Sequence, residues 1–285
     1  MGILLLFINQ LVYQGSGMVT RRYGKKHGSG GIFFNAVICL FSMVFFVLTD
    51  KGGLCFSKQL LAYGAVSCIM FIAGFYFMYI ALQLGSYAIT ILLSNFSRIM
   101  AIVYGIAFLK EPANFGTYVA FALIFISVFL MNYEKKNDNQ TNTVSVKWLL
   151  CVLVCIVSNG FIAILQRMQQ IRFDGLCDNE FMIISLGGAF AALLVIAIIK
   201  EGSNIKSVVK YGGIYGMCAG LLNGAQNLIS LAVYMYIPIS LATPIRTGLS
   251  TVFSFAVSIL LYKERFTLRQ FAGALCGVAA LLMLI

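Results

Sequence analysis

Residues 133–147 read YEKKNDNQTNTVSVK, and this polar stretch divides a chain that is otherwise strongly apolar. Of the 285 residues, 61% are hydrophobic and only 10% are charged, with a mean hydropathy of +0.94. A soluble domain carries roughly 25% charged residues because its surface must be wetted. Charge this sparse indicates that most of the protein surface faces something other than water.

On both sides of this linker, charges gather in short clusters between apolar runs of about 20 residues, the length at which a helix crosses the bilayer. We predict spans at 2–20, 31–49, 59–83, 86–109, 113–132, 147–166, 180–199, 211–236, 238–262 and 267–285. The alternating segments typical of a membrane β-barrel do not occur. The sequence therefore predicts an all-α integral membrane protein of about ten transmembrane helices.

The part of the chain after the linker repeats the part before it. At an offset of 145 residues, Gln14-Gly15 matches Asn159-Gly160, and Arg22 matches Arg167. At an offset of 153 residues, Thr90 matches Thr243, and Lys110-Glu111 matches Lys263-Glu264. Each half has five spans, an odd number, so the second half enters the membrane from the opposite side. We predict two inverted five-helix repeats, at 1–132 and 147–285, joined by the linker at 133–146. Inverted repeats recur in secondary transporters.

The closing segment, TPIRTGLSTVFSFAVSILLYKERFTLRQFAGALCGVAALLMLI (243–285), resembles EamA-type members of the drug/metabolite transporter superfamily. The resemblance rests on a Pro near the start of a span, a Glu at its end and a Gly pair in the last span, here Pro244, Glu264, Gly273 and Gly277. In the first half of the chain, Glu111 occupies the position that corresponds to Glu264. The resemblance implies a ten-helix inverted-repeat carrier with a central cavity, which moves small metabolites or drugs by alternating access. It does not identify the cargo.

Two arginines are the sharpest polar features inside the spans, where charged side chains are costly and usually functional. Arg98 lies near the middle of the fourth predicted span and Arg246 lies in the ninth, whereas no Asp or Glu lies well inside any span. One interpretation is a cationic anchor for an anionic or zwitterionic cargo, because guanidinium groups suit carboxylates and phosphates. The alternative is a structural bond from each arginine to carbonyls or amides.

Amides and a hydroxyl accompany the arginines within the spans and could either line a wet cavity or bond neighbouring helices together. The further candidate substrate-binding residues are Asn95, Asn223, Gln226, Asn227, Thr243, Gln10, Gln14 and Asn159. Glu111 and Glu264 end their spans as Lys-Glu pairs, and we consider them candidate gate contacts. The alternative for these two is an ordinary charge at a helix end.

Other functional classes fit poorly. With one His, nine acidic residues and no catalytic motif such as GxSxG, an enzyme is not expected. No Cys/His cluster or nucleotide-binding motif predicts a metal or cofactor. Proton-coupled export of lipophilic cations is disfavoured because no carboxylate lies within a span, so facilitated diffusion or anion exchange fits better. The remaining alternative is a non-transporting structural or sensory polytopic membrane protein.

The net charge of +11 is explained by basic membrane loops rather than by nucleic acid. The loops after the first, fifth, seventh and ninth spans carry 13 of the 20 Lys and Arg residues, and those after the second, fourth and sixth carry 5. The positive-inside rule then places both termini outside the cytoplasm, whereas the family resemblance implies termini inside. We expect a multi-pass protein of the cell membrane, whose partners are the bilayer and a small-molecule substrate, and the sequence leaves a homodimer open.

Overall fold

The computed structural model describes residues 2–27, 31–50, 52–54, 56–85, 90, 93–94, 96–111, 115–132, 146–202, 205–260 and 268–284. Within these residues the regular structure is helical throughout, as the sequence predicts. The long helices are α1 (Gly2–His27), α2 (Gly31–Thr49), α3 (Lys58–Leu84), α5 (Ser97–Ala107), α6 (Phe115–Asn132), α7 (Val146–Phe173), α8 (Asp178–Glu201), α10 (Gly213–Tyr236), α11 (Ile239–Leu260) and α12 (Leu268–Leu284). Two short pieces, α9 (Ile205–Ser207) and the π-helix η1 (Val208–Gly212), join α8 to α10.

Five helices of the described part are long and apolar enough to cross a membrane by themselves: Gly2–Gly24 within α1, α2, α3, α7 and α8. Large apolar side chains also remain exposed around the bundle, including Leu4 at 64%, Phe115 at 82% and Ile199 at 76%. So many large exposed apolar side chains are unusual for a protein in water but ordinary where the surface faces lipid. The protein is therefore an all-α integral membrane protein.

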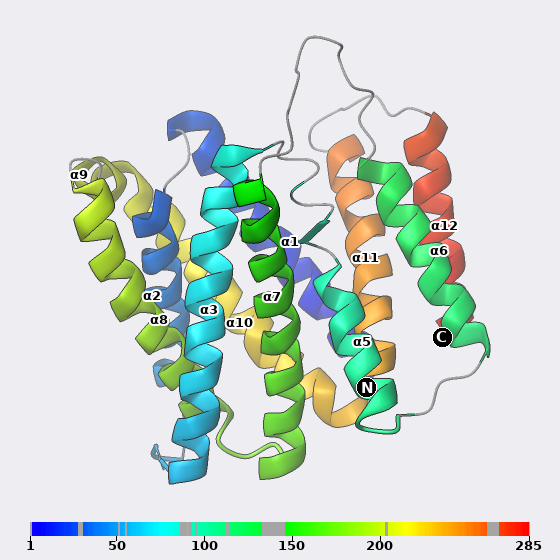
Figure 1. Ribbon diagram of the computed structural model, residues 1–285, viewed down its shortest axis with the longest axis horizontal. Helices are drawn as coiled ribbons and strands as arrows, with labels where there is room; N and C mark the ends of the chain where they lie inside the picture. Colours follow the sequence, from blue (N-terminus) through cyan, green and yellow to red (C-terminus); the bar gives the residue numbers. More distant parts are fainter. Residues whose placement is uncertain are drawn as a thin grey trace.

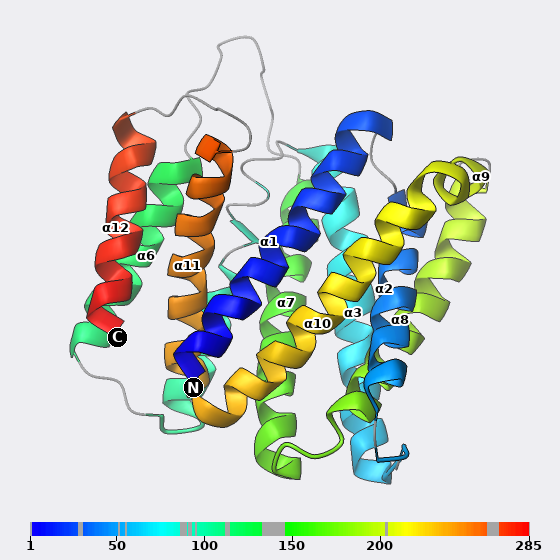
Figure 2. The ribbon, with the colours of Figure 1, turned by 180° about the vertical axis from the view of Figure 1, so that it is seen from behind.

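The two halves are related by inversion. Figure 1 shows α1 rising from the lower end of the bundle, where α3 begins and α7 ends, while its counterpart α7 descends. Helix pairs match when the halves are exchanged: α1 packs on α10 as α7 packs on α3, and α2 packs on α10 as α8 packs on α3. The pairs α2–α8, α5–α11 and α6–α12 join equivalent helices directly. Figure 2 shows α1 and α10 side by side on the opposite face.

Glycines allow the closest helix crossings. A Cβ atom at Gly160 on α7 would lie 3.0 Å from the Ser97 carbonyl oxygen at the start of α5. A Cβ at Gly64 on α3 would lie 2.7 Å from Ile184 on α8. Small residues at such crossings let helix backbones approach, which gives the packing that apolar burial cannot supply in lipid. The crossing of α5 on α7 fixes one wall of the site described next.

Candidate functional site

A central cavity of about 160 Å³ lies between α1, α5, α7, α10 and α11. Its lining residues come from both halves of the chain: Gln10, Tyr13, Ser97, Arg98, Ala101, Asn159, Ala163, Gln226, Tyr234, Thr243 and Arg246. Six of the ten candidate substrate-binding residues meet here, namely Gln10, Arg98, Asn159, Gln226, Thr243 and Arg246. A cavity at the interface of inverted repeats is where secondary transporters bind their substrates.

The two arginines reach this cavity from helices that pack on each other. Arg98 lies in the first turn of α5, and Arg246 lies on α11 two residues after Pro244. Pro244 removes the backbone bond to the Ser240 carbonyl, which loosens the helix just before Arg246. The Arg246 guanidinium lies 5.4 Å from the centre of the Tyr234 ring, a cation–π contact. The charges of Arg98 and Arg246 are close enough to repel each other.

Several polar atoms of the lining are buried without a partner among the described residues. They are Nε and Nη2 of Arg246, Nε2 of Gln10 and Oγ1 of Thr243. Buried polar groups in folded proteins are nearly always hydrogen-bonded, and each exception calls for an explanation. Neither arginine has a carboxylate partner in the part of the chain that the structure describes. Within the described residues, the cavity thus presents donors and positive charge with no negative group beside them.

Other predicted residues lie elsewhere. Asn223 Oδ1 accepts bonds from Ser42 on α2 at 3.1 Å and from Asn227 at 3.1 Å, and Asn227 Oδ1 accepts from Gln166 on α7 at 3.0 Å. These two amides join α10 to its neighbours and do not line the cavity. Gln14 donates to the Ser250 carbonyl on α11 at 3.1 Å and also lies outside the cavity. Asn95 and Glu264 lie outside the described residues.

Glu111 is buried at the lower end of the bundle, in a cluster that joins three helix ends. Its Oε1 accepts from the Ile239 amide at 3.1 Å and its Oε2 from the Ser240 amide at 2.8 Å, so the carboxylate caps the start of α11. Arg167 on α7 pairs with the same carboxylate, at 3.2 Å from Nε and 3.1 Å from Nη2. Arg167 Nη1 also donates to the Tyr234 carbonyl on α10. We call this cluster of Glu111, Arg167 and the α11 N-terminus the lower clamp.

Two conformational features bring Glu111 into the clamp. Lys110 adopts a positive φ of 52°, which turns the chain back after α5. A Cβ at Gly105 would lie 2.6 Å from Glu111 Oε2 and 2.8 Å from Ile239 Cγ2, so only glycine leaves room for the carboxylate. A negative charge at a helix N-terminus is further stabilised by the helix dipole. The contacts of Arg167 and Gly105 with Glu111 could not be predicted from the sequence, because nothing in the spacing of these residues points to Glu111.

Tyr13 and Tyr234 are the other functional candidates that the sequence did not reveal. Both line the cavity, and Tyr234 is only 1% exposed. An aromatic residue in an apolar span carries no signal that distinguishes a cavity wall from a packed core.

The comparisons with known proteins agree with this architecture. The model of the EamA-like transporter family matches residues 1–133 and 146–285, which is nearly the whole chain in two copies. This chain belongs to the EamA-like transporter family. A crystal structure of another protein superposes on the EamA-like chain with a TM-score of 0.74 at 13% identity, covering 99% of this chain and 97% of that one, which shows a shared fold. No curated protein matches the sequence. Family and helices together make this EamA-like protein a multi-pass membrane transporter of the drug/metabolite transporter superfamily.

Proposed function

We propose that this protein is a secondary transporter of the cell membrane that binds an acidic small molecule between Arg98 and Arg246 and carries it by alternating access. The observation that supports the cargo class is the pair of guanidinium groups facing one cavity without a carboxylate among the described residues. A buried charge without a partner is expensive, and a carboxylate or phosphate on the cargo would compensate it. The unpartnered atoms of Gln10 and Thr243 would then donate to the same ligand or to its hydroxyl groups.

The position of the arginines in the repeat favours a role in binding over a role in the scaffold. At the offset of 153 residues, Arg98 corresponds to Thr251 and Arg246 corresponds to Leu93. Each arginine therefore occurs in one half only, unlike Glu111, which has Glu264 as its counterpart. Residues that hold a duplicated fold together recur in both copies, whereas a site for an asymmetric ligand has no reason to.

The lower clamp supports the alternating-access part of the proposal. Glu111 and Arg167 tie the ends of α5 and α10 and the last turns of α7 to the start of α11. Arg22, which corresponds to Arg167 in the other half, is exposed and has no hydrogen-bond or ion-pair partner among the described residues. The clamp is formed at the lower end, and its counterpart at the other end would pair Arg22 with Glu264, which lies outside the described residues. In this proposal the structure represents a state closed at the lower end, and Glu111 acts as a gate contact.

The cargo proposal is tested by a thermal-shift screen of purified protein against organic acids, nucleotides and amino acids. We expect acidic compounds to raise the melting temperature of the native protein and to have little effect on Arg98→Ala or Arg246→Ala. Arg22→Ala is the matched control, because that arginine is exposed and lies away from the cavity. Equal stabilisation of the native protein and both cavity variants would refute the anchor role of the arginines.

A further inference from the structure

A second hollow, separate from the central cavity, lies at the lower end of the bundle. It has a volume of about 470 Å³ and is lined by Gln59 and Tyr63 of α3, Leu109 after α5, and Met168, Ile171 and Arg172 of α7. It shares no described lining residue with the central cavity. We call it the α3–α5 groove.

The groove exists because α3 and α5 do not pack closely on each other. α3 packs against α2, α7 and α8, whereas α5 packs against α7 and α11, so α7 forms the floor between them. Ile171 on this floor is 49% exposed, which shows that the groove opens on the outside of the bundle. In a membrane protein, such an outward opening near helix ends faces lipid at the level of the headgroups.

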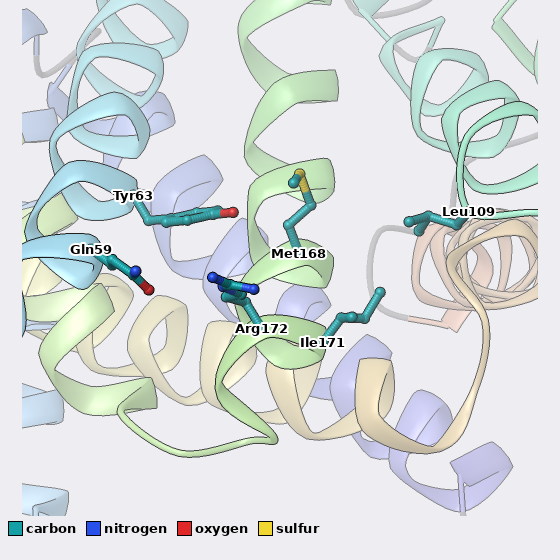
Figure 3. Close-up of a pocket in the computed structure, with 6 residues that line it drawn as sticks. All are labelled: Gln59, Tyr63, Leu109, Met168, Ile171 and Arg172. Carbon is teal, nitrogen blue, oxygen red and sulfur yellow. The ribbon is translucent and has the colours of Figure 1, made fainter.

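The lining has two chemically distinct parts. Figure 3 shows the polar ends of Gln59, Tyr63 and Arg172 lying near one another on one side, with Met168, Ile171 and Leu109 on the other. One part offers hydrogen-bond donors and a positive charge, and the other offers only apolar contact. A water-soluble anion would use the first part alone, whereas an amphipathic molecule would use both.

Among the described residues, no negative charge compensates the cation of the polar part. Arg172 has no hydrogen-bond or ion-pair partner in the described chain. The exposed Lys58 precedes Gln59, and the exposed Lys110 follows Leu109, so two more cations flank the groove. Asp174 lies in the turn beyond α7 and does not line it. Cations at a membrane interface attract anionic lipid headgroups.

We propose that the α3–α5 groove is a binding site for one anionic phospholipid. Arg172, with Gln59 and the Tyr63 hydroxyl, would bind the phosphate, and Leu109, Met168 and Ile171 would contact the first carbons of an acyl chain. The site is independent of the cargo. Its position has a consequence, however, since Met168 follows Arg167 in α7 and Leu109 lies two residues before Glu111. A bound lipid therefore contacts residues close in sequence to the lower clamp.

The test uses the full-length protein, purified in detergent and stripped of lipid, with lipid binding measured by native mass spectrometry. Phosphatidylglycerol and phosphatidylcholine with identical acyl chains are the probes, and inorganic phosphate is the competitor. We expect phosphatidylglycerol to bind more tightly than phosphatidylcholine, and Arg172→Gln to weaken its binding about tenfold, as expected for loss of one charge-assisted hydrogen bond. Arg22→Gln, an equally exposed arginine at the opposite end, is the matched control and should bind as the native protein does.

Three outcomes would overturn the proposal. Arg172→Gln could retain phosphatidylglycerol as well as the Arg22→Gln control does. Phosphatidylglycerol and phosphatidylcholine could bind with equal affinity, which would show that the groove does not recognise an anionic headgroup. Inorganic phosphate could displace phosphatidylglycerol completely at equal concentration, which would make the groove a site for a free anion. None of these results depends on whether the central cavity binds an acidic cargo.

Discussion

The lower clamp makes a quantitative prediction for the pair Glu111→Gln and Arg167→Gln. Glutamine has the shape of Glu111 and is shorter than Arg167, and at both positions it removes the charge. In the native protein the Glu111 carboxylate accepts one hydrogen bond and an ion-pair contact from Arg167, and two hydrogen bonds from the backbone amides that begin α11. The variant Glu111→Gln keeps one acceptor oxygen and places an amide group where the second oxygen was. At least one donor of the cluster then has no acceptor.

The expected cost follows from burial. The side chains of Arg167 and Glu111 are only 16% and 5% exposed, so water screens the pair little. Hydrogen bonds to charged groups contribute about 1.5–3 kcal/mol each, and removing one member of a buried pair costs about 3–5 kcal/mol. Since Arg167 is partly exposed and can turn toward water, we expect each single variant to lower the free energy of unfolding by about 2–4 kcal/mol. The coupling energy between the two sites should be about 1.5–3 kcal/mol, because the double variant loses the shared interaction only once.

The coupling is measured by a double-mutant cycle on the native protein, both single variants and the double variant, unfolded reversibly with SDS in mixed micelles. Arg22→Gln combined with Glu111→Gln is the control cycle, because Arg22 is the counterpart of Arg167 but lies at the other end. That control should give additive effects. If the changes in unfolding free energy for Glu111→Gln and Arg167→Gln also add within about 0.5 kcal/mol, the two residues do not stabilise each other and the clamp is refuted.

Two further predictions concern the clamp and the orientation of the chain. Gly105→Ala would place a Cβ 2.6 Å from Glu111 Oε2, so it should lower the melting temperature by several degrees. Gly17→Ala is the control, because its Cβ would meet nothing within 4 Å, and it should leave the melting temperature unchanged or raise it slightly. Equal changes in melting temperature for both variants would contradict the steric explanation. A reporter active only in the cytoplasm should be silent when fused to either terminus, since both ends of the chain belong to the less basic side; activity at both termini would show that the charge count misleads here.

The spans could be predicted from sequence because the bilayer imposes length and apolarity on each of them. Their ends could not, and α7 shows why. Its predicted span ends at residue 166, yet the helix continues to Phe173 through three buried glutamines. Gln166 bonds to Asn227, Gln169 to the Leu176 carbonyl, and Gln170 to Asp178. Hydropathy marks these residues as the end of a span, whereas their partners, distant in sequence or beyond a turn, allow the helix to continue.

The composition of the cavity could be predicted in part, for a related reason. The absence of carboxylates from the spans drew attention to Arg98 and Arg246, and the structure brings both to one cavity. Asn223 and Gln226 are three residues apart on α10, and either could have faced the cavity. Only the rotation of α10 against α2 and α7 decides that Gln226 lines it while Asn223 bonds to Ser42. That rotation depends on packing between helices, which a single sequence does not encode in its local pattern.

The central claim is that the two arginines bind an acidic cargo during transport, and counterflow in proteoliposomes tests it most directly. Vesicles loaded with an unlabelled acidic compound that stabilises the purified protein are diluted into a trace of the same compound in labelled form. We predict that native protein and Lys206→Gln, a change at an exposed cation outside the cavity and the clamp, accumulate the label transiently, and that Arg98→Gln and Arg246→Gln do not. Accumulation by both cavity variants at the native rate would contradict the claim.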